Sequence, residues 1–205
     1  MQLVVFDLDF CIWQPEMYQI QGPPILKNLQ SIQPKLKRKR RNDTQQLKFK
    51  LPKNPNSNQK GMIVTDRNGT PITVFDGASY ALSEINRWRQ QKDDTDSAKS
   101  NIRVAVASCT NEPSYARKCM DWLVVDDGST LASCFDCIEI RPGDKRKHFE
   151  SLQRITGIPY EDMCFFDDYD LNINNVRTLG VKCFHTPFGM TRDIWEDALD
   201  TFDLN

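Results

Sequence analysis

The chain has 205 residues, of which 39% are hydrophobic and 27% are charged, and its formal net charge is −1. This length and composition suit a single domain with one core, residues 1–205, and exclude a chain that is disordered throughout. The seven cysteines have no regular spacing, the N-terminus lacks a signal-peptide pattern, and no apolar run reaches the roughly 18 to 20 residues of a membrane span. These features predict a cytoplasmic protein without a membrane partner.

The first 60 residues contain one apolar strand and a long polar stretch. Residues 2–6, QLVVF, predict a short buried strand. Residues 27–60 are rich in proline and polar residues, and they bury too little apolar surface to offset their chain entropy. They predict a largely disordered, basic insertion, because residues 21–60 contain eleven Lys or Arg and only one acid, Asp43.

After the insertion, strands and helices alternate. Two β-rich runs in residues 61–75 flank Asn68-Gly69, a strong turn signal, and predict a small hairpin. Short apolar strands are expected at 101–108, 137–140, 163–166 and 181–185, and helices at 79–91, 114–123, 145–156, 171–179 and 191–202. This order predicts an α/β fold whose mostly parallel sheet is covered by helices on both faces. The intervals leave no room for a large cap domain, so the site is expected to be open.

Polar residues follow these strands where each strand ends. Asp7 and Asp9 follow the first strand, and Ser108 ends the second. Since ligands of parallel sheets bind at the carboxyl ends of the strands, we expect these side chains to converge. The same holds for Lys145, Asp167 and Asp168, which complete the candidate set.

The paired acids Asp7 and Asp9 raise an electrostatic question. Residues two apart in an extended strand point the same way, so both carboxylates can face one cleft. Two buried anions repel each other and require a compensating positive charge.

Four motifs carry a family resemblance. "VFDLDFCIW", "VAVAS", "RPGDK" and "CFFDD" resemble, in order and spacing, the four motifs of the haloacid dehalogenase superfamily. More narrowly, Trp13, "VASCTNEP" at 106–113, residues 142–168 and "NVRTLGVKCFH" at 175–185 resemble the magnesium-dependent phosphatase-1 group. The resemblance covers residues 2–13 and roughly 61–203, and the basic insertion lies outside it. It implies a three-layer, Rossmann-like fold.

The resemblance also implies a Mg²⁺-dependent phosphomonoester hydrolase. Asp7 would attack phosphorus to give an aspartyl-phosphate, and Asp9 would protonate the leaving oxygen and then activate water. The implied ligands of Mg²⁺ are Asp7, the backbone carbonyl of Asp9, and Asp168. Asp167 is the less favoured ligand or an outer-shell anchor.

Four further residues receive roles from the resemblance. Ser108 would hydrogen-bond a phosphoryl oxygen, the amides of Leu8, Asp9 and Cys109 would do likewise, and Lys145 would balance charge. The implied substrates are phosphotyrosine-like or sugar-phosphate monoesters, on small molecules or protein side chains, including protein tyrosine phosphatase activity. Two alternatives stay open: a non-catalytic binding or regulatory protein with the same fold, and a phosphotransferase.

Two cysteines depart from the family pattern. Cys11 stands where Thr or Val is usual, and we interpret it as a small packing residue, with a redox-sensitive thiol as the alternative. Cys109 stands where close relatives carry Arg, so it removes a cation beside the phosphate and leaves the substrate preference open.

The remaining metal-binding residue types do not predict a zinc site. Cys134 and Cys137 form a lone CxxC pair, whereas structural zinc needs four ligands. His148 and His185 are interpreted as a helix-surface residue and a strand-end residue.

The cluster "KLKRKRR" at 35–41 is either a solvated charge run or a signal for an import receptor or an anionic surface. An import signal would place the protein in the nucleus as well as the cytoplasm. Nucleic-acid binding by the fold is not expected, because the rest of the chain is acidic.

Overall fold

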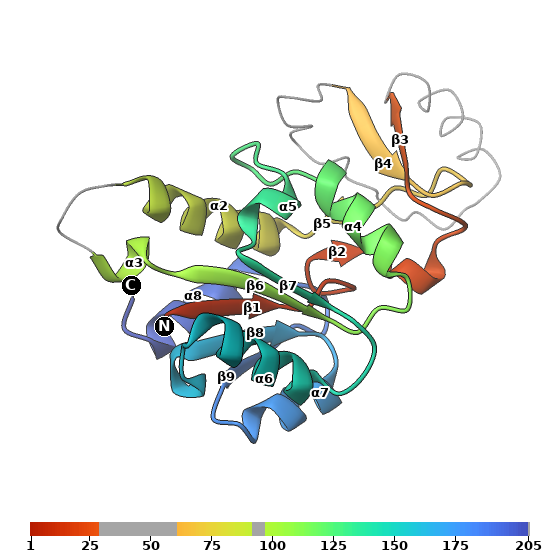
Figure 1. Ribbon diagram of the computed structural model, residues 1–205. Helices are drawn as coiled ribbons and strands as arrows, with labels where there is room; N and C mark the ends of the chain where they lie inside the picture. The colour runs from red at the N-terminus through yellow and green to blue at the C-terminus, as the bar shows by residue number, and fades with distance from the viewer. Residues whose placement is uncertain (29–60, 92–96, 205) are drawn as a thin grey trace.

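Five parallel strands form the central sheet, in the order β7-β6-β1-β8-β9 (Figure 1). The protein is described by a computed structural model, which covers residues 1–28, 61–91 and 97–204. Leu3 of β1 pairs with Arg103 of β6 on one side and with Met163 of β8 on the other. The strands are β1 (Leu3–Phe6), β6 (Arg103–Ser108), β7 (Cys137–Ile140), β8 (Met163–Asp167) and β9 (Lys182–His185).

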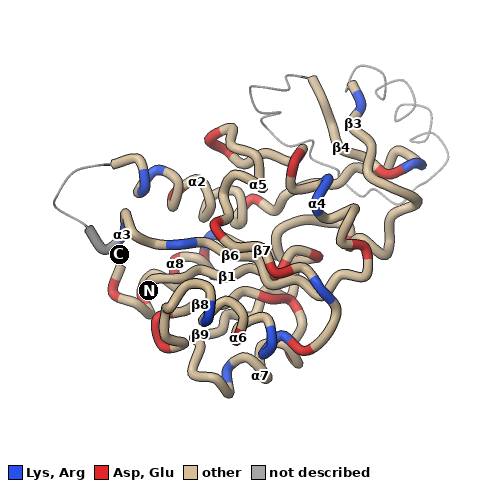
Figure 2. Tube along the Cα trace, viewed as in Figure 1, with Lys and Arg blue, Asp and Glu red and all other residues tan. Residues whose placement is uncertain are grey.

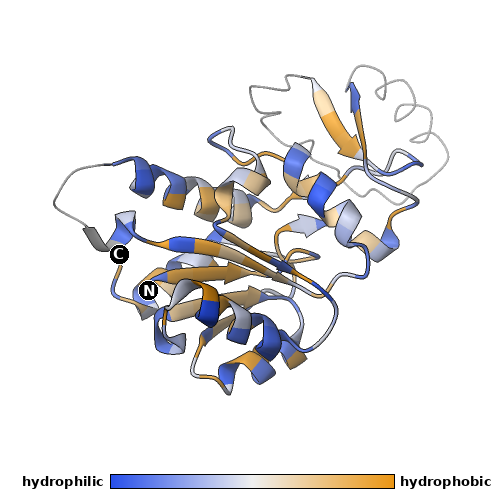
Figure 3. Ribbon diagram, in the orientation of Figure 1, coloured by the Kyte–Doolittle hydropathy of each residue, from blue (hydrophilic) through white to orange (hydrophobic). Residues whose placement is uncertain are grey.

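Helices cover both faces of this sheet, which gives three layers. Alternate residues of a strand point to opposite faces, so Val4 packs in one core and Val5 in the other. The first core contains residues of α2 (Asp76–Gln90), α4 (Pro113–Trp122), α5 (Leu131–Cys134) and α8 (Arg192–Thr201), and the second contains residues of α6 (Lys145–Thr156) and α7 (Asp170–Arg177). Figure 3 shows apolar strands between helices whose outer faces are hydrophilic. The predicted three-layer α/β fold is therefore confirmed.

The strand order places a topological switch point at β1. The chain leaves β1 for β6 and β7 on one side, and it then returns to β8 and β9 on the other. In open sheets of this type, ligands bind outside the carboxyl ends of the strands where the order reverses. Asp7 directly follows β1 at this point.

The chain reverses at Asn68-Gly69 as predicted, but the two runs beside the turn pair elsewhere. Thr65 and Pro71 form an isolated bridge with a backbone hydrogen bond on each side of it, from Asp66 to Thr70 and from Ile72 to Val64, both 2.9 Å, but no longer ladder joins the two runs. β4 (Met62–Thr65) pairs with β3 (Ile25–Asn28), and β5 (Thr73–Val74) pairs with β2 (Trp13–Gln14). The predicted hairpin is thus two small antiparallel ribbons.

Other boundaries differ in detail. Lys27 and Asn28 belong to β3, so the predicted insertion begins inside a strand, and its residues 29–60, with the basic cluster 35–41, lie outside the described residues. The structure adds the short helices α3 (Ser97–Ser100), α5, η1 (Met17–Gln19) and η2 (Tyr160–Asp162). None of the helices in the described ranges has the length and apolar composition needed to cross a membrane.

The start of α2 packs unusually closely on the segment before α8. A Cβ atom added at Gly77 would lie 2.3 Å from the backbone carbon of Thr191 and 2.5 Å from the carbonyl oxygen of Met190. Met190 in turn donates its backbone N–H to the carbonyl of Cys11, at 3.0 Å. Glycine at position 77 therefore lets α2 approach the loops that surround the candidate site.

Candidate active site

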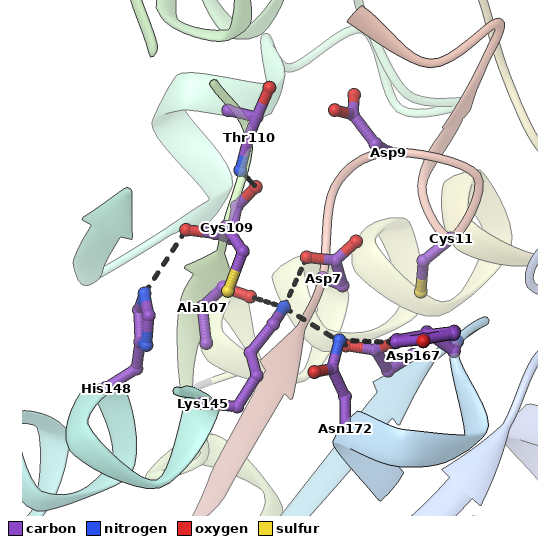
Figure 4. A network of polar contacts seen from close by, with 12 residues as sticks. Asp7, Asp9, Cys11, Ala107, Cys109, Thr110, Lys145, His148, Asp167 and Asn172 are labelled. Carbon is purple, nitrogen blue, oxygen red and sulfur yellow. Dashed lines mark hydrogen bonds and ion pairs between the residues drawn. The ribbon is translucent and has the colours of Figure 1, made fainter. Parts of the chain in front are cut away.

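Lys145 is the buried cation at the centre of the site. Three consecutive basic residues open α6 (blue in Figure 2), but only Lys145 enters the interior, where it is 1% exposed. Asp144 caps the helix by accepting the backbone N–H of Arg146 at 2.9 Å, which fixes where α6 begins. The Lys145 ammonium donates to the carboxylate of Asp7 and to the carbonyl of Ala107 (Figure 4).

A second carboxylate also contacts this ammonium. Asp167 Oδ2 lies 3.0 Å from Lys145 Nζ. Burial alone would lower the pKa of Lys145, but the charges of Asp7 and Asp167 outweigh it and raise that pKa. Burial also raises the pKa of Asp7 well above its usual range, against the attraction of Lys145. The direction for Lys145 thus follows from the two carboxylates around it, and the direction for Asp7 follows mainly from burial.

Asp9 is held separately from Lys145. Its Oδ1 accepts hydrogen bonds from Trp13 Nε1 at 2.8 Å and from the backbone N–H of Met17 at 3.2 Å. Figure 4 shows Asp9 above Asp7 and opposite Thr110, whose side chain also hydrogen-bonds it. Burial raises the pKa of Asp9 despite these bonds, as suits an acid that donates a proton.

The turn that follows the two acids is tight. The carbonyl of Leu8 accepts the backbone N–H groups of Ile12, at 2.9 Å, and of Trp13, at 3.3 Å. Phe10 adopts a φ of 56°, a left-handed conformation that is rare for a bulky residue, and its ring packs edge-on against Phe75. Such backbone outliers concentrate at functional sites.

The neighbours Asp167 and Asp168 have different surroundings. Asp167 is fully buried, and both of its oxygens accept hydrogen bonds from Asn172, at 3.2 and 3.0 Å, while Oδ1 also accepts the backbone N–H of Tyr169. Asp168 is half-buried, and no side chain in the described parts of the chain donates to its carboxylate. Burial and the charge of Asp167 raise the pKa of Asp168 to about 6. This arrangement favours Asp168 as a metal ligand and Asp167 as its anchor.

Ser108 and Cys109 lie at the end of β6. Ser108 is buried, and its hydroxyl is 3.4 Å from the backbone nitrogen of Thr110. The Cys109 thiol donates to the carbonyl of Gly143 at 3.0 Å, and burial raises its pKa despite nearby Lys145. Cys109 therefore connects this loop to the segment that leads into α6.

Both histidines brace loops of the site, a role that the sequence interpretation missed. His148 is fully buried, not on the helix surface as predicted, and its Nε2 lies 3.2 Å from the carbonyl oxygen of Ser108 and 3.0 Å from that of Arg141. The spacing of residues 145, 148, 149 and 152 on one helical face could have indicated this. His185 ends β9 as predicted, and its Nε2 is 2.9 Å from the carbonyl oxygen of Asp168.

Trp13 and Asn172 were not assigned a role from the sequence. Trp13 positions Asp9, and Asn172 positions Asp167. The aromatic residue four positions after Asp9 was visible in the sequence as part of a motif, but its contact was not. Asn172 lies in the first turns of α7, where only the packing of that helix decides what its amide meets.

The cysteines are packing residues. Cys11 is buried, its thiol donates to the carbonyl of Phe166 at 3.4 Å, and burial raises its pKa well above the usual value, which disfavours a reactive thiolate. Cys134 and Cys137 are also buried and unpaired. Across residues 1–28, 61–91 and 97–204, no three His, Cys, Asp or Glu side chains are arranged as ligands of one metal ion.

The acid cluster nevertheless fits a divalent cation by charge and by donor type. The carboxylates of Asp7, Asp167 and Asp168 share the single ammonium of Lys145 within the described site, which leaves two negative charges in excess. Burial raises the pKa of Asp7 and of Asp168, so a nearby dication would stabilise both carboxylates. Carboxylate and carbonyl oxygens are the ligands that Mg²⁺ prefers.

Comparison with known proteins agrees with this geometry. The family model described as Acid Phosphatase matches residues 1–205. Magnesium-dependent phosphatase 1 of Homo sapiens is 50% identical over 207 aligned residues, which cover 98% of this chain and 86% of the human protein. A HAD-like hydrolase superfamily protein of Schizosaccharomyces pombe is 32% identical over 133 residues, which cover 63% of this chain and 69% of that protein.

A solved structure shares the fold. The N-terminal part of the protein BF1531 from Bacteroides fragilis, which contains a phosphatase domain and is complexed with Mg, superposes with a TM-score of 0.51 at 14% identity. The match covers all of this chain and 40% of that chain. The chain belongs to the acid phosphatase family, within the haloacid dehalogenase superfamily, and its similarity to the magnesium-dependent phosphatase-1 group is confirmed.

Proposed function

We propose that this protein is a Mg²⁺-dependent phosphatase that hydrolyses phosphate monoesters through an aspartyl-phosphate on Asp7. The observation that carries the proposal is the division of labour between two acids: Asp7 contacts the buried ammonium of Lys145, whereas Asp9 is held apart by Trp13. One acid is thus placed as a nucleophile and the other as a proton donor. Membership of the acid phosphatase family and the 50% identity to the human magnesium-dependent enzyme support the metal dependence.

The reaction would proceed in two halves. A carboxylate oxygen of Asp7 forms a bond to phosphorus while the bond from phosphorus to the leaving oxygen breaks, and Asp9 gives its proton to that oxygen. Water then attacks phosphorus, Asp9 takes a proton from this water, and the Asp7 carboxylate is released with inorganic phosphate. Asp7, the carbonyl of Asp9 and Asp168 would hold Mg²⁺, which when bound offsets the charge of the phosphoryl oxygens.

The other residues of the site position the phosphoryl group. Lys145 balances the charge on the nucleophile, and the Ser108 hydroxyl lies at the end of the adjacent strand β6. The backbone amides of Leu8, Asp9 and Cys109 are the further donors for phosphoryl oxygens in this mechanism. Positioning and electrostatic stabilisation supply most of the catalysis in phosphoryl transfer.

Aromatic side chains beside the site support a phosphotyrosine-like substrate. Tyr18, Tyr169 and Phe188 are 69%, 58% and 83% exposed. Tyr169 and Phe188 follow β8 and β9, at the edge where Asp7 lies, and Tyr18 lies in η1, after β2. Tyr18 donates to Glu16 at 3.2 Å, and the preceding residue, Met17, donates its backbone N–H to Asp9 at 3.2 Å, which places η1 beside the site. Exposed rings can pack edge-on or offset against the ring of an aryl phosphate.

The first test compares substrates with and without the metal. Hydrolysis of p-nitrophenyl phosphate, a phosphotyrosine peptide and a hexose phosphate is measured in Mg²⁺ and in EDTA, for the wild type and for Asp7→Asn. Turnover that needs Mg²⁺ and is lost in Asp7→Asn supports the proposal. Metal-independent turnover, or a fully active Asp7→Asn variant, contradicts it.

The second test addresses the substrate class. Phe188→Ala should lower kcat/KM for the two aryl phosphates and leave that for the hexose phosphate unchanged. Ile155→Ala is the matched control, since Ile155 is an exposed apolar residue on α6, away from this edge. If kcat/KM fell equally for the aryl phosphates and the hexose phosphate, the aromatic side chains would not support a phosphotyrosine-like substrate.

The two alternatives have distinct signatures. Cys11 and Cys109 motivate a non-catalytic protein, but the acids, the hydroxyl and the ammonium expected of an active enzyme are all present. Such a protein would bind Mg²⁺ and phosphate analogues without turnover. A phosphotransferase differs in the second half-reaction, and it would give a phosphorylated product when an alcohol or sugar acceptor is added.

A further inference from the structure

Thr186 carries an unsatisfied polar group beside the site. It directly follows β9, its side chain is fully buried, and its hydroxyl has no hydrogen-bond partner, alone among the buried side-chain oxygens and nitrogens of the described residues. Burying a hydroxyl without a partner costs free energy, so such groups in native structures call for a specific explanation. A partner that arrives with a bound ligand would supply one.

The position of Thr186 points to the acid cluster. Its backbone N–H donates to the carbonyl of Asp167 at 2.9 Å. Its side chain lies next to the thiol of Cys11, whose pKa is raised by burial and lowered only in part by the hydroxyl, because sulfur is too weak an acceptor to satisfy that hydroxyl. The charges of Asp7, Asp167 and Asp168 all act on that same thiol, and Figure 4 shows Cys11 beside Asp7. The hydroxyl thus adjoins a small volume that three carboxylates surround.

Most neighbouring groups are already engaged. The Cys11 thiol proton is directed to the carbonyl of Phe166, and sulfur is a weak acceptor. Both oxygens of Asp167 accept hydrogen bonds from Asn172. Within the described residues, the carboxylate of Asp168 and the second oxygen of Asp7 accept no side-chain hydrogen bond, so they are the oxygens of the acid cluster that remain open to a donor.

We propose that Thr186 is a positioning residue of the metal site, whose hydroxyl donates to the metal-binding carboxylate pair Asp7 and Asp168 when Mg²⁺ is bound. This inference rests on the proposed function. In proteins the groups that hydrogen-bond to metal ligands fix the orientation of those ligands and raise the affinity for the metal. Thr186 would act in this way on the side opposite Lys145, without touching the substrate.

The test uses Thr186→Val, which removes the hydroxyl at nearly constant shape, and Thr186→Ser, which keeps it. Thr65→Val is the matched control, because Thr65 is equally buried but its hydroxyl donates to the carbonyl of Asp66 at 3.0 Å. Two quantities are measured on the full chain without substrate. They are the melting temperature in EDTA and the Mg²⁺ dissociation constant from calorimetry or from the Mg²⁺-dependent thermal shift.

Thr186→Val should melt in EDTA at or above the temperature of the wild type, because an unpaired buried hydroxyl is removed, and should bind Mg²⁺ about tenfold more weakly. Thr186→Ser should restore the affinity. Thr65→Val should melt lower and keep the wild-type affinity. Thr186→Val with unchanged Mg²⁺ affinity, or with a melting temperature lowered like that of Thr65→Val, would overturn the inference. A wild type that binds no Mg²⁺ would overturn the proposed function as well.

Discussion

Replacing Lys145 by Met removes the only ammonium that faces the buried acids within the described site, while methionine keeps most of the apolar stem. Lys145 donates to Asp7 and to Ala107, and it lies 3.0 Å from Asp167. The variant leaves two buried carboxylates without their cation. We therefore expect Lys145→Met to be strongly destabilised in the absence of metal.

The expected loss is about 3 to 5 kcal/mol, the usual cost of removing one partner of a buried ion pair. Protonation sets an upper limit to this cost. The pKa of Asp7 is already raised by burial, and loss of Lys145 raises it further, so Asp7 can take up a proton at neutral pH. For a chain of this length, such a loss corresponds to a decrease in melting temperature of roughly 6 to 20 °C.

Urea denaturation in EDTA measures the free energy of unfolding directly, and the chelator prevents metal from replacing the lost charge. Lys147→Met is the matched control, because Lys147 lies on the same helix with an exposed side chain, and its change should stay within about 0.5 kcal/mol. The double variant Asp7→Asn, Lys145→Met should lose less than the sum of the two single changes. A loss below about 1 kcal/mol in Lys145→Met would refute the reasoning, since unpaired buried charges cost more than that.

The other predictions concern the surroundings of the site. Asn172→Ala should weaken Mg²⁺ binding about 10- to 100-fold in a calorimetric titration, because Asp167 loses its amide donor; unchanged affinity would contradict the anchoring role. Gly77→Ala should lower stability by about 1 to 3 kcal/mol or more in thermal denaturation, because its Cβ would meet backbone atoms of Thr191; an unchanged melting temperature would show that α2 is less tightly packed there. Burial lowers the pKa of His148, so below about pH 6.5 the unfolded chain binds a proton that the folded chain does not yet bind, and the free energy of unfolding should decrease as the pH falls. In His148→Gln the free energy of unfolding, measured by urea titration at several pH values, should depend less on pH than in the wild type. An unchanged pH dependence would mean that other groups cause it.

Much of the fold could be predicted from the sequence, because the signals were local. The apolar run of β7 and the span of α6, which Asp144 begins and Gly157 ends, lie where the sequence analysis placed them. The positions of Asp7 and Asp167 at the same edge of the sheet could also be predicted, because both follow apolar strands and a parallel sheet brings the carboxyl ends of its strands to one edge.

The features that could not be predicted depend on contacts between distant segments. The partner of β4 is β3, which precedes residues 29–60 in the sequence, and no local pattern indicates a pairing across that distance. Asp167 accepts side-chain hydrogen bonds and Asp168 does not, because the packing of α7 places the amide of Asn172 against Asp167. The unpaired hydroxyl of Thr186 likewise arises only when the segment after β9 packs against Cys11.

The small ribbon of β3 and β4 has a consequence for protein engineering. Asn28 pairs with Met62, so the two ends of the intervening stretch are held side by side by the ribbon (Figure 1). Changing the length of a loop between fixed ends costs only about 0.6 kcal/mol per doubling. This position is thus a natural graft point, where an epitope or a fluorescent reporter could replace the native stretch while the chain folds around the same anchors.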